Sequence, residues 1–168
     1  VNSVGNSGQL GPSSLGAPAD VQGVIAVGAV NADSSIASFS SRGPAANGKI
    51  VPDLVAPGTG ITTADTGRDG LEYNRQGTSF SAPFVTGICA LILQSGNGIG
   101  ARECRDRLYA SCYLLPDQDS VDNTYGRGLP DAARACGMRS DDVVIQVRDR
   151  FRRAVTSALI ITGRDSVV

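Results

Sequence analysis

The chain has 168 residues, of which 41% are hydrophobic and 5% are aromatic, and its formal net charge is −1. This length is sufficient for one domain with its own hydrophobic core. The near-neutral charge gives no electrostatic case for binding nucleic acid or an anionic membrane. No apolar run approaches the roughly 20 residues that a transmembrane helix needs. Scarce aromatic residues with many glycines and alanines favour an α/β protein with helices packed closely on a sheet.

The sequence begins at Val1, and its first residues, VNSVGNSG, are typical of the middle of a fold. No charged segment followed by an apolar segment, the pattern of a signal peptide, is visible. We therefore expect a fragment or a processed chain.

Two apolar runs predict buried strands. The run GVIAVGAV, residues 23–30, is continuous rather than alternating, as in a parallel strand covered on both faces. A short strand is expected at Leu54–Ala56, where Pro57-Gly58 ends it. The Gly-, Thr- and Asp-rich stretch Gly60–Gly70 is expected to be a loop.

The strongest helix prediction is Ser79–Ser95, whose all-round hydrophobicity indicates a central helix with little exposed surface. We expect Pro83 to be tolerated because it falls in the first turn. An amphipathic surface helix is predicted over Ala101–Cys112, since Cys104, Leu108 and Cys112 recur every four residues. Asp131 is expected to cap a short helix that follows it.

The pattern of apolar and polar residues changes after residue 137. Val143, Ile145 and Val147 alternate with polar residues and predict strands. We therefore assign residues 1–137 to one domain and residues 138–168 to a linker and the start of a β-rich module.

The four cysteines, Cys89, Cys104, Cys112 and Cys136, lack CxxC spacing, and the chain has no histidine, which argues against a zinc site. They allow three disulfide connectivities or none. Cys89 is expected to be a small buried hydrophobic residue.

Ser79 is the candidate nucleophile. It follows Gly77-Thr78 at the start of an apolar helix, where unpaired N–H groups and the helix dipole favour an anion. A serine hydroxyl must be exposed on a rigid support while a base takes its proton. Taken alone, Thr78, Ser79 and Ser81 would more often merely cap a helix.

The full motif GTSFSAPFVTG, residues 77–87, resembles the nucleophile motif of subtilisin-like serine proteases, the subtilases. The stretches GNSG, VIAVGAV, FSSRGP, PDLVAPG and YGRGLPDAARA extend the resemblance from Val1 to about Gly137. It implies the C-terminal half of a three-layer α/β/α domain with a mostly parallel sheet, followed by a short β-like tail.

The resemblance also implies roles for individual residues. Ser79 would form an acyl-enzyme, and the side-chain amide of Asn6 would help to stabilise the oxyanion, together with the N–H of Ser79. Ser3-Val4-Gly5, Gly77 and Thr78 would contact the substrate. No cofactor or catalytic metal is expected, although a structural calcium could lie near residues 16–24.

The subtilase triad needs an aspartate and a histidine, which in this family precede the serine along the chain. None of Asp20, Asp33 and Asp53 lies in a matching motif, and Lys49 is a poor substitute base because it sits in a loop. We expect the missing groups in an N-terminal half upstream of Val1, so that this segment alone is inactive.

The leading hypothesis is a secreted or cell-surface serine endopeptidase that cleaves polypeptides, without a nucleic-acid partner or membrane span. A non-catalytic binding or structural module and an inactive truncated fragment stay as alternatives. Without the other half, apolar surface on the strand at 24–30 and on the nucleophile helix would be uncovered. We therefore expect the isolated chain to be unstable, or to be docked to its other half or another copy.

Overall fold

The computed structural model describes residues 1–65, 67 and 69–138. The strands predicted around Val143–Val147, and nearly all of the predicted second module, lie outside the described residues. The described elements are, in chain order, β1 (Asn2–Ser3), the 3-10 helix η1 (Gly8–Leu10), β2 (Ala26–Val30), β3 (Leu54–Pro57), β4 (Ile61–Ala64), β5 (Leu71–Arg75), α1 (Thr78–Ser95), α2 (Ala101–Ser111), β6 (Cys112–Tyr113), β7 (Leu129–Pro130) and α3 (Ala132–Ala135).

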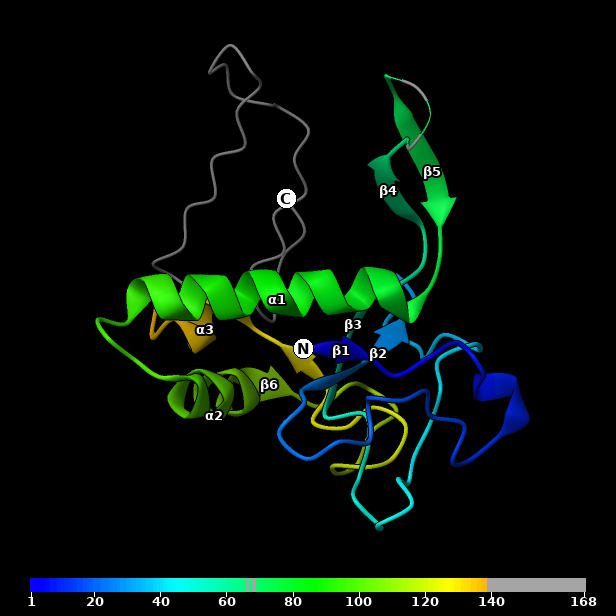
Figure 1. Cartoon of the computed structure of the whole chain (residues 1–168), viewed down its shortest axis with the longest axis horizontal. Helices are drawn as coiled ribbons and strands as arrows, with labels where there is room; N and C mark the ends of the chain where they lie inside the picture. The colour runs from blue at the N-terminus through cyan, green and yellow to red at the C-terminus, as the bar shows by residue number, and fades with distance from the viewer. Residues whose placement is uncertain (66, 68, 139–168) are drawn as a thin grey trace.

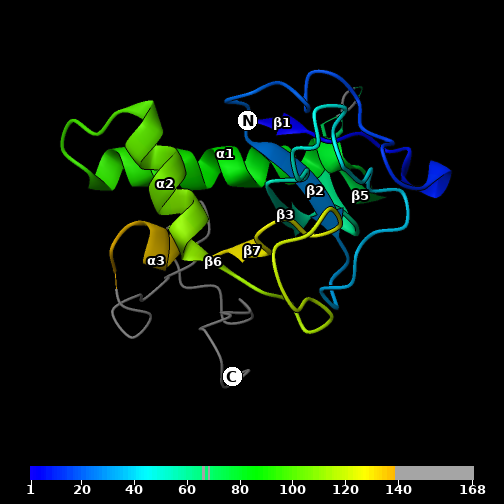
Figure 2. The same ribbon diagram turned by 90° about the horizontal axis from the view of Figure 1, so that it is seen from below.

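The central sheet is parallel, with strand order β1-β2-β3. Helix α1 lies along one face of this sheet, and loop segments lie on the other side (Figures 1 and 2). Val27 and Leu54 pack in the same core cluster as Val85 of α1. The neighbouring Ala26 and Val55 pack in two other clusters. Because successive side chains of a strand point to opposite faces, β2 and β3 are covered on both faces. All five residues of β2 are buried, so the expected uncovered apolar surface on this strand is wrong. The predicted α/β class and mostly parallel sheet are confirmed.

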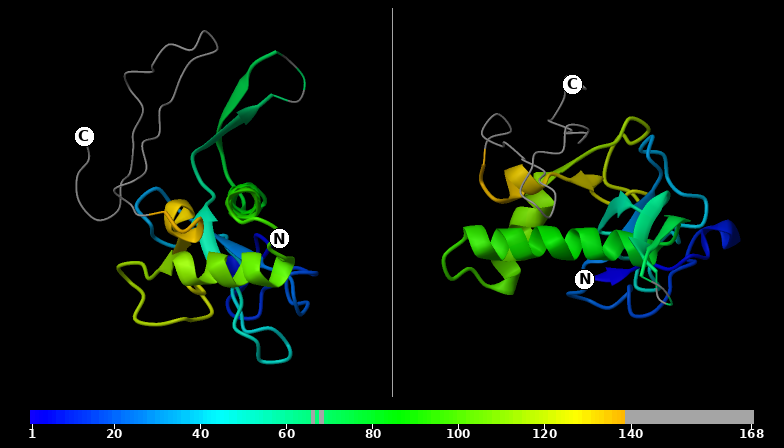
Figure 3. Two further views of the ribbon diagram at one scale, coloured as in Figure 1. Left: turned by 90° about the vertical axis from the view of Figure 1, so that its left-hand side faces the viewer. Right: turned by 90° about the horizontal axis from the view of Figure 1, so that it is seen from above.

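Helix α1 is less buried than its sequence predicts. Val85 and Ile92 are fully buried, but Phe84, Leu91 and Leu93 are each 48% exposed. The described sheet, α2 and α3 all lie on one side of α1, so its outward side has no cover from the described residues (Figure 3). By length and composition α1 could cross a bilayer, with 18 residues, a mean hydropathy of 1.3 and 22% of them buried. A core helix of a soluble domain meets the same criteria.

The position of Pro83 within α1 corrects one prediction. Pro83 is the sixth residue of a helix that begins at Thr78, so it lies in the second turn. Proline has no N–H, and the carbonyl of Ser79 therefore lacks the donor four residues later that the helix normally supplies. The helix continues unbroken to Ser95 despite this loss.

The predicted loop at Gly60–Gly70 is wrong in part, because β4 and β5 form an antiparallel hairpin that projects beyond the start of α1 (Figure 1). Both strands are mostly exposed, with Leu71 56% and Tyr73 65% exposed. Neither strand has a fully buried residue, so the hairpin lacks the apolar pattern by which a strand is predicted from sequence.

The amino ends of β2 and β3 are joined by the buried carboxylate of Asp53. It accepts the backbone N–H of Ala26 at 2.8 Å and pairs with Lys49 at 3.3 Å and with Arg127 at 3.8 Å. The guanidinium of Arg127 also lies 4.1 Å from the ring centre of Tyr109. A surface cavity of about 420 Å³ opens beside these groups. This edge of the sheet is the one opposite Ser79.

Helices α2 and α3 match their predictions closely. Cys104 and Leu108 are buried on the inner face of α2, and the carboxylate of Asp131 caps α3 by accepting the N–H of Arg134 at 3.0 Å.

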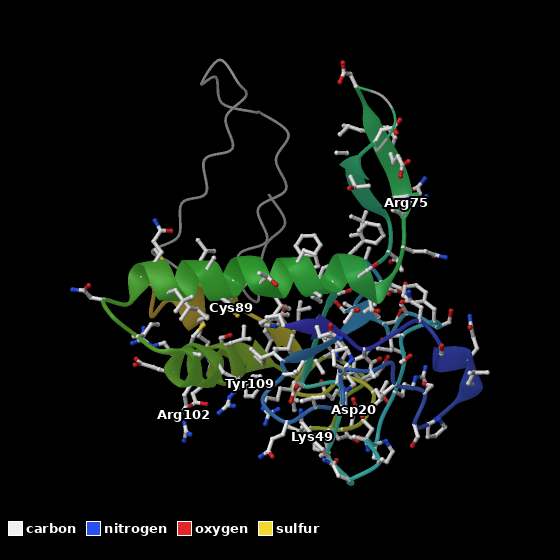
Figure 4. All side chains as sticks on the ribbon, viewed as in Figure 1. Asp20, Lys49, Arg75, Cys89, Arg102 and Tyr109 are labelled. Atoms are coloured by element: carbon white, nitrogen blue, oxygen red, sulfur yellow. The ribbon has the colours of Figure 1, made fainter. Side chains whose placement is uncertain are left out.

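All four cysteines are free thiols. The thiol of Cys104 lies 3.7 Å from the carbonyl oxygen of Cys89, on the side of α1 that faces α2 (Figure 4). Burial, with a smaller contribution from Cys104, raises the pKa of Cys89 to about 11. Partly buried Cys89 is therefore a packing residue, as predicted.

Candidate active site

Three segments meet at the carboxyl edge of the sheet. They are the loop after β1 that carries Asn6, the Pro57-Gly58 turn at the end of β3, and the start of α1. Ligands of open α/β sheets bind at this edge. Gly58 allows the close approach: a Cβ there would lie 2.5 Å from the hydroxyl oxygen of Ser81 and 2.6 Å from Ala29. The start of α1 is thus fixed on the ends of β2 and β3.

Ser79 is the second residue of α1 and is exposed. The helix begins after Gly77, and the first N–H groups of a helix have no partner within it. Ser81, two residues later, is fully buried and donates to the carbonyl of Pro57 at 3.1 Å. Of these two serines, only Ser79 can reach a substrate.

Thr78 connects the start of α1 to Asn6. Its backbone N–H and its hydroxyl both donate to Oδ1 of Asn6, each at 2.9 Å. The Thr78 side chain is fully buried, so it holds Asn6 and does not line a substrate pocket as the sequence had suggested. With Oδ1 engaged twice, the orientation of the Asn6 amide is set, and its Nδ2 group is directed away from Thr78.

Gly77 separates the two candidate catalytic groups. A Cβ at this position would lie 3.1 Å from Oγ of Ser79 and 3.5 Å from Nδ2 of Asn6, so both atoms border the same small space. Its φ of +149° with ψ of 150° falls in a region that is essentially restricted to glycine. The glycine is therefore required both for backbone conformation and for space.

The predicted wall Ser3-Val4-Gly5 is divided between two environments. The side chain of Val4 is fully buried in a core cluster with Ala26 and Val51, which rules out a substrate contact through that side chain. Ser3 and Gly5 are partly exposed. Only these two positions of the wall therefore offer surface to a substrate.

Sequence reasoning missed Ser41. This serine is fully buried and contacts the backbone on both sides of Asn6. The motif FSSRGP was recognised as typical of the subtilases, but a buried serine in a loop has no periodic pattern that would assign it a partner. Only the three-dimensional arrangement shows the contact.

Within the described residues, no three His, Cys, Asp or Glu side chains are grouped to hold a metal ion. The stretch 16–24, where calcium was expected, contains one carboxylate, that of Asp20. Backbone carbonyls would have to supply the other ligands. Those of Gly16 and Pro18 already accept the N–H groups of Ala19 and Val21. Calcium at this position stays a prediction.

Comparisons with known proteins show which family this chain resembles. The model of the Subtilase family, peptidase S8, matches residues 1–128. Bacillopeptidase F of Bacillus subtilis (strain 168) is 33% identical over 134 residues, covering 78% of this chain and 9% of that protein. Subtilisin amylosacchariticus of Bacillus subtilis subsp. amylosacchariticus is 39% identical over 126 residues, covering 74% of this chain and 30% of that protein.

Solved structures of proteases also superpose on this chain. The patellamide maturation protease PatA superposes with a TM-score of 0.66 at 27% identity, covering 82% of this chain and 51% of that one. The prenylagaramide maturation protease PagA gives a TM-score of 0.65 at 26% identity, covering 80% and 48%. The fold and these relatives define the class as serine proteases. Within that class, the chain belongs to the subtilase family. It spans a third or less of the length of the two curated relatives described above.

Proposed function

We propose that this chain contributes the nucleophile and the oxyanion site of a serine endopeptidase that cleaves polypeptides. The observation that carries the proposal is the shared space beside Gly77, bordered by Oγ of Ser79 and Nδ2 of Asn6. When Ser79 attacks a peptide carbonyl, negative charge develops on the carbonyl oxygen. An amide held in place by Thr78 would stabilise that charge without first having to reorient.

The proposal requires a base from outside this sequence, because the chain contains no histidine. We propose that a segment of the same domain supplies the histidine and the aspartate, and that it covers the outward side of α1. The half-exposed Phe84 and Leu91 support this: they are seven residues apart and therefore lie on one face of the helix, and large apolar side chains are normally covered. By itself, the chain is expected to be inactive.

We also propose an extracellular or cell-surface location, in keeping with the family resemblance. Fractionation of the producing cells, followed by detection of the chain in the medium or at the surface, tests this. Recovery from the cytosol alone would contradict it.

The central experiment treats the full-length protein that contains this chain with a fluorophosphonate probe, which phosphonylates an activated serine. We expect labelling of the wild type and its loss in Ser79→Ala. The control is Ser81→Ala, which removes a hydroxyl from the same helix at a buried position and should leave labelling intact. A well-folded wild type that is not labelled would instead favour the binding or structural module.

A further inference from the structure

One buried residue holds the backbone on both sides of Asn6. The N–H of Ser41 donates to the carbonyl of Gly5 at 3.0 Å, and the hydroxyl oxygen of Ser41 accepts the N–H of Ser7 at 3.0 Å. Asn6 lies between these two peptide groups. A single side chain and its own backbone therefore fix the loop segment from which the Asn6 amide projects.

Ser41 is itself tightly fixed. It is fully buried, and a Cβ on Gly5 would lie 3.0 Å from its hydroxyl oxygen, so the two segments are in close contact. Its neighbour Ser40 is also fully buried and accepts the N–H of Ala29 in β2 at 3.0 Å. The hydroxyl of Ser40 thus bonds to the central sheet, whereas Ser41 bonds to the Asn6 loop.

The constraint matters because Asn6 is exposed on a loop. Thr78 fixes the end of its side chain, but the backbone of a surface loop would otherwise move. Catalytic groups must be held within about 0.5 Å of their productive position, and an error of about 1 Å can cost about 10²-fold in rate. A donor on an exposed loop needs support of the kind that Ser41 provides.

We propose that Ser41 is a positioning residue, which keeps the Asn6 amide in place for the oxyanion through its hydrogen bond to Ser7. This inference rests on the proposed function. Ser41 touches neither Ser79 nor the reacting carbonyl; it acts through Asn6. It supports the transition state selectively, because the oxyanion forms only there.

Ser41→Ala in the full-length protease tests the proposal. The variant leaves the N–H of Ser7 without its acceptor but keeps the backbone bond to Gly5, so the substrate wall before Asn6 is retained. We expect kcat to fall about tenfold, a fraction of the about 10²–10³ lost with a whole oxyanion donor. KM should change less than about twofold, as for an interaction made only in the transition state.

Ser40→Ala is the matched control. It also removes a fully buried hydroxyl that accepts a backbone N–H at 3.0 Å, but the N–H belongs to β2 rather than to the Asn6 loop. Both variants should lower the melting temperature by similar amounts. Only Ser41→Ala should lower kcat, and Ser41→Cys, which keeps a weak acceptor, should recover part of it. Ser41→Cys also provides the test if the alanine variant does not fold.

The decisive measurement repeats Ser41→Ala in an Asn6→Ala background. If Ser41 acts through Asn6, its loss has no further effect on kcat there, because coupled residues are not additive. A tenfold loss that persists in that background, or equal losses for Ser40→Ala and Ser41→Ala, overturns the proposal. A wild type without turnover, or Asn6→Ala with unchanged kcat, overturns the proposed function and this inference together.

Discussion

The start of α1 and its outward side are built in opposite ways. At the start, Thr78 is fully buried and bonded to Asn6, and the space beside Gly77 is bordered by polar atoms at defined positions. Further along the helix, Phe84, Leu91 and Leu93 are each half-exposed. One helix therefore carries, at its start, hydrogen bonds to Asn6 that are complete within the chain and, further along, apolar side chains that lack cover.

This contrast separates the geometry of the site at Asn6 from the stability of the fold. The proposed oxyanion arrangement depends on hydrogen bonds between Thr78 and Asn6 that the described residues already make, so it needs no partner to form. The apolar side lacks cover, and burying a large apolar side chain contributes about 1.5–3 kcal/mol. A covering segment would therefore mainly stabilise the fold and supply the base, and would not have to shape the oxyanion site.

The largest expected effect is that of Gly77→Ala. This variant tests whether the space beside Gly77, which the chain forms without a partner, is needed for the reaction of Ser79. The new Cβ would lie 3.1 Å from Oγ of Ser79 in a glycine-only conformation. We expect about 1–3 kcal/mol lower stability and the loss of most fluorophosphonate labelling in the full-length protein.

Gly48→Ala separates crowding from backbone strain. Gly48 also has a positive φ, +80°, but no atom lies within 4 Å of its Cβ position. Its replacement should lower stability by about 1 kcal/mol and leave labelling unchanged. Similar labelling for Gly77→Ala and wild type would show that the space beside Gly77 is not used.

A smaller effect is expected for the outward side of α1. In size-exclusion chromatography, the isolated chain should elute as oligomers or aggregates, because exposed apolar surface associates. The double variant Leu91→Ser and Leu93→Ser should shift it towards the monomer. The matched change Val85→Ser, at a fully buried position of the same helix, should increase aggregation. A compact monomeric wild-type chain would contradict the need for cover.

The smallest effect concerns the inward side of α1 and the adjoining α2–α3 region. Burial raises the pKa of Cys89 to about 11 and that of Cys112 to about 12, from 9.0 in the unfolded chain. Since the unfolded state loses these protons first, their contribution to stability is full below about pH 9 and falls as the pH rises towards 11–12.

Chemical denaturation of the full-length protein between pH 8 and pH 11 measures this dependence. Replacing both cysteines with alanine should make it less steep, while the raised pKa of Tyr109 leaves a residual slope of the same sign. An unchanged slope in the double variant would show that the two thiols are not buried as described.

Much of this arrangement could be predicted from sequence. The apolar runs located β2 and β3, and the GTSFSAP motif located Ser79 at the start of a helix. The β4–β5 hairpin could not be found, because neither strand has a fully buried residue. The inward turn of Thr78 and the contacts of Ser41 depend on how α1 and two loops meet. Uncovered apolar surface on the nucleophile helix was expected, but not that Leu91 and Leu93 would carry it, because hydrophobicity shows that a residue prefers burial and not which segment covers it.

Asp53 has a wider consequence. Its carboxylate, balanced by Lys49 and Arg127, clasps the amino ends of β2 and β3 and the segment before β7. The strands are thus held together at one edge, while Ser79 and Asn6 lie at the other. Because the two edges are separate, a change of sequence in the loops beside Ser79 would leave the hydrogen bonds and ion pairs that hold the opposite edge of the sheet intact.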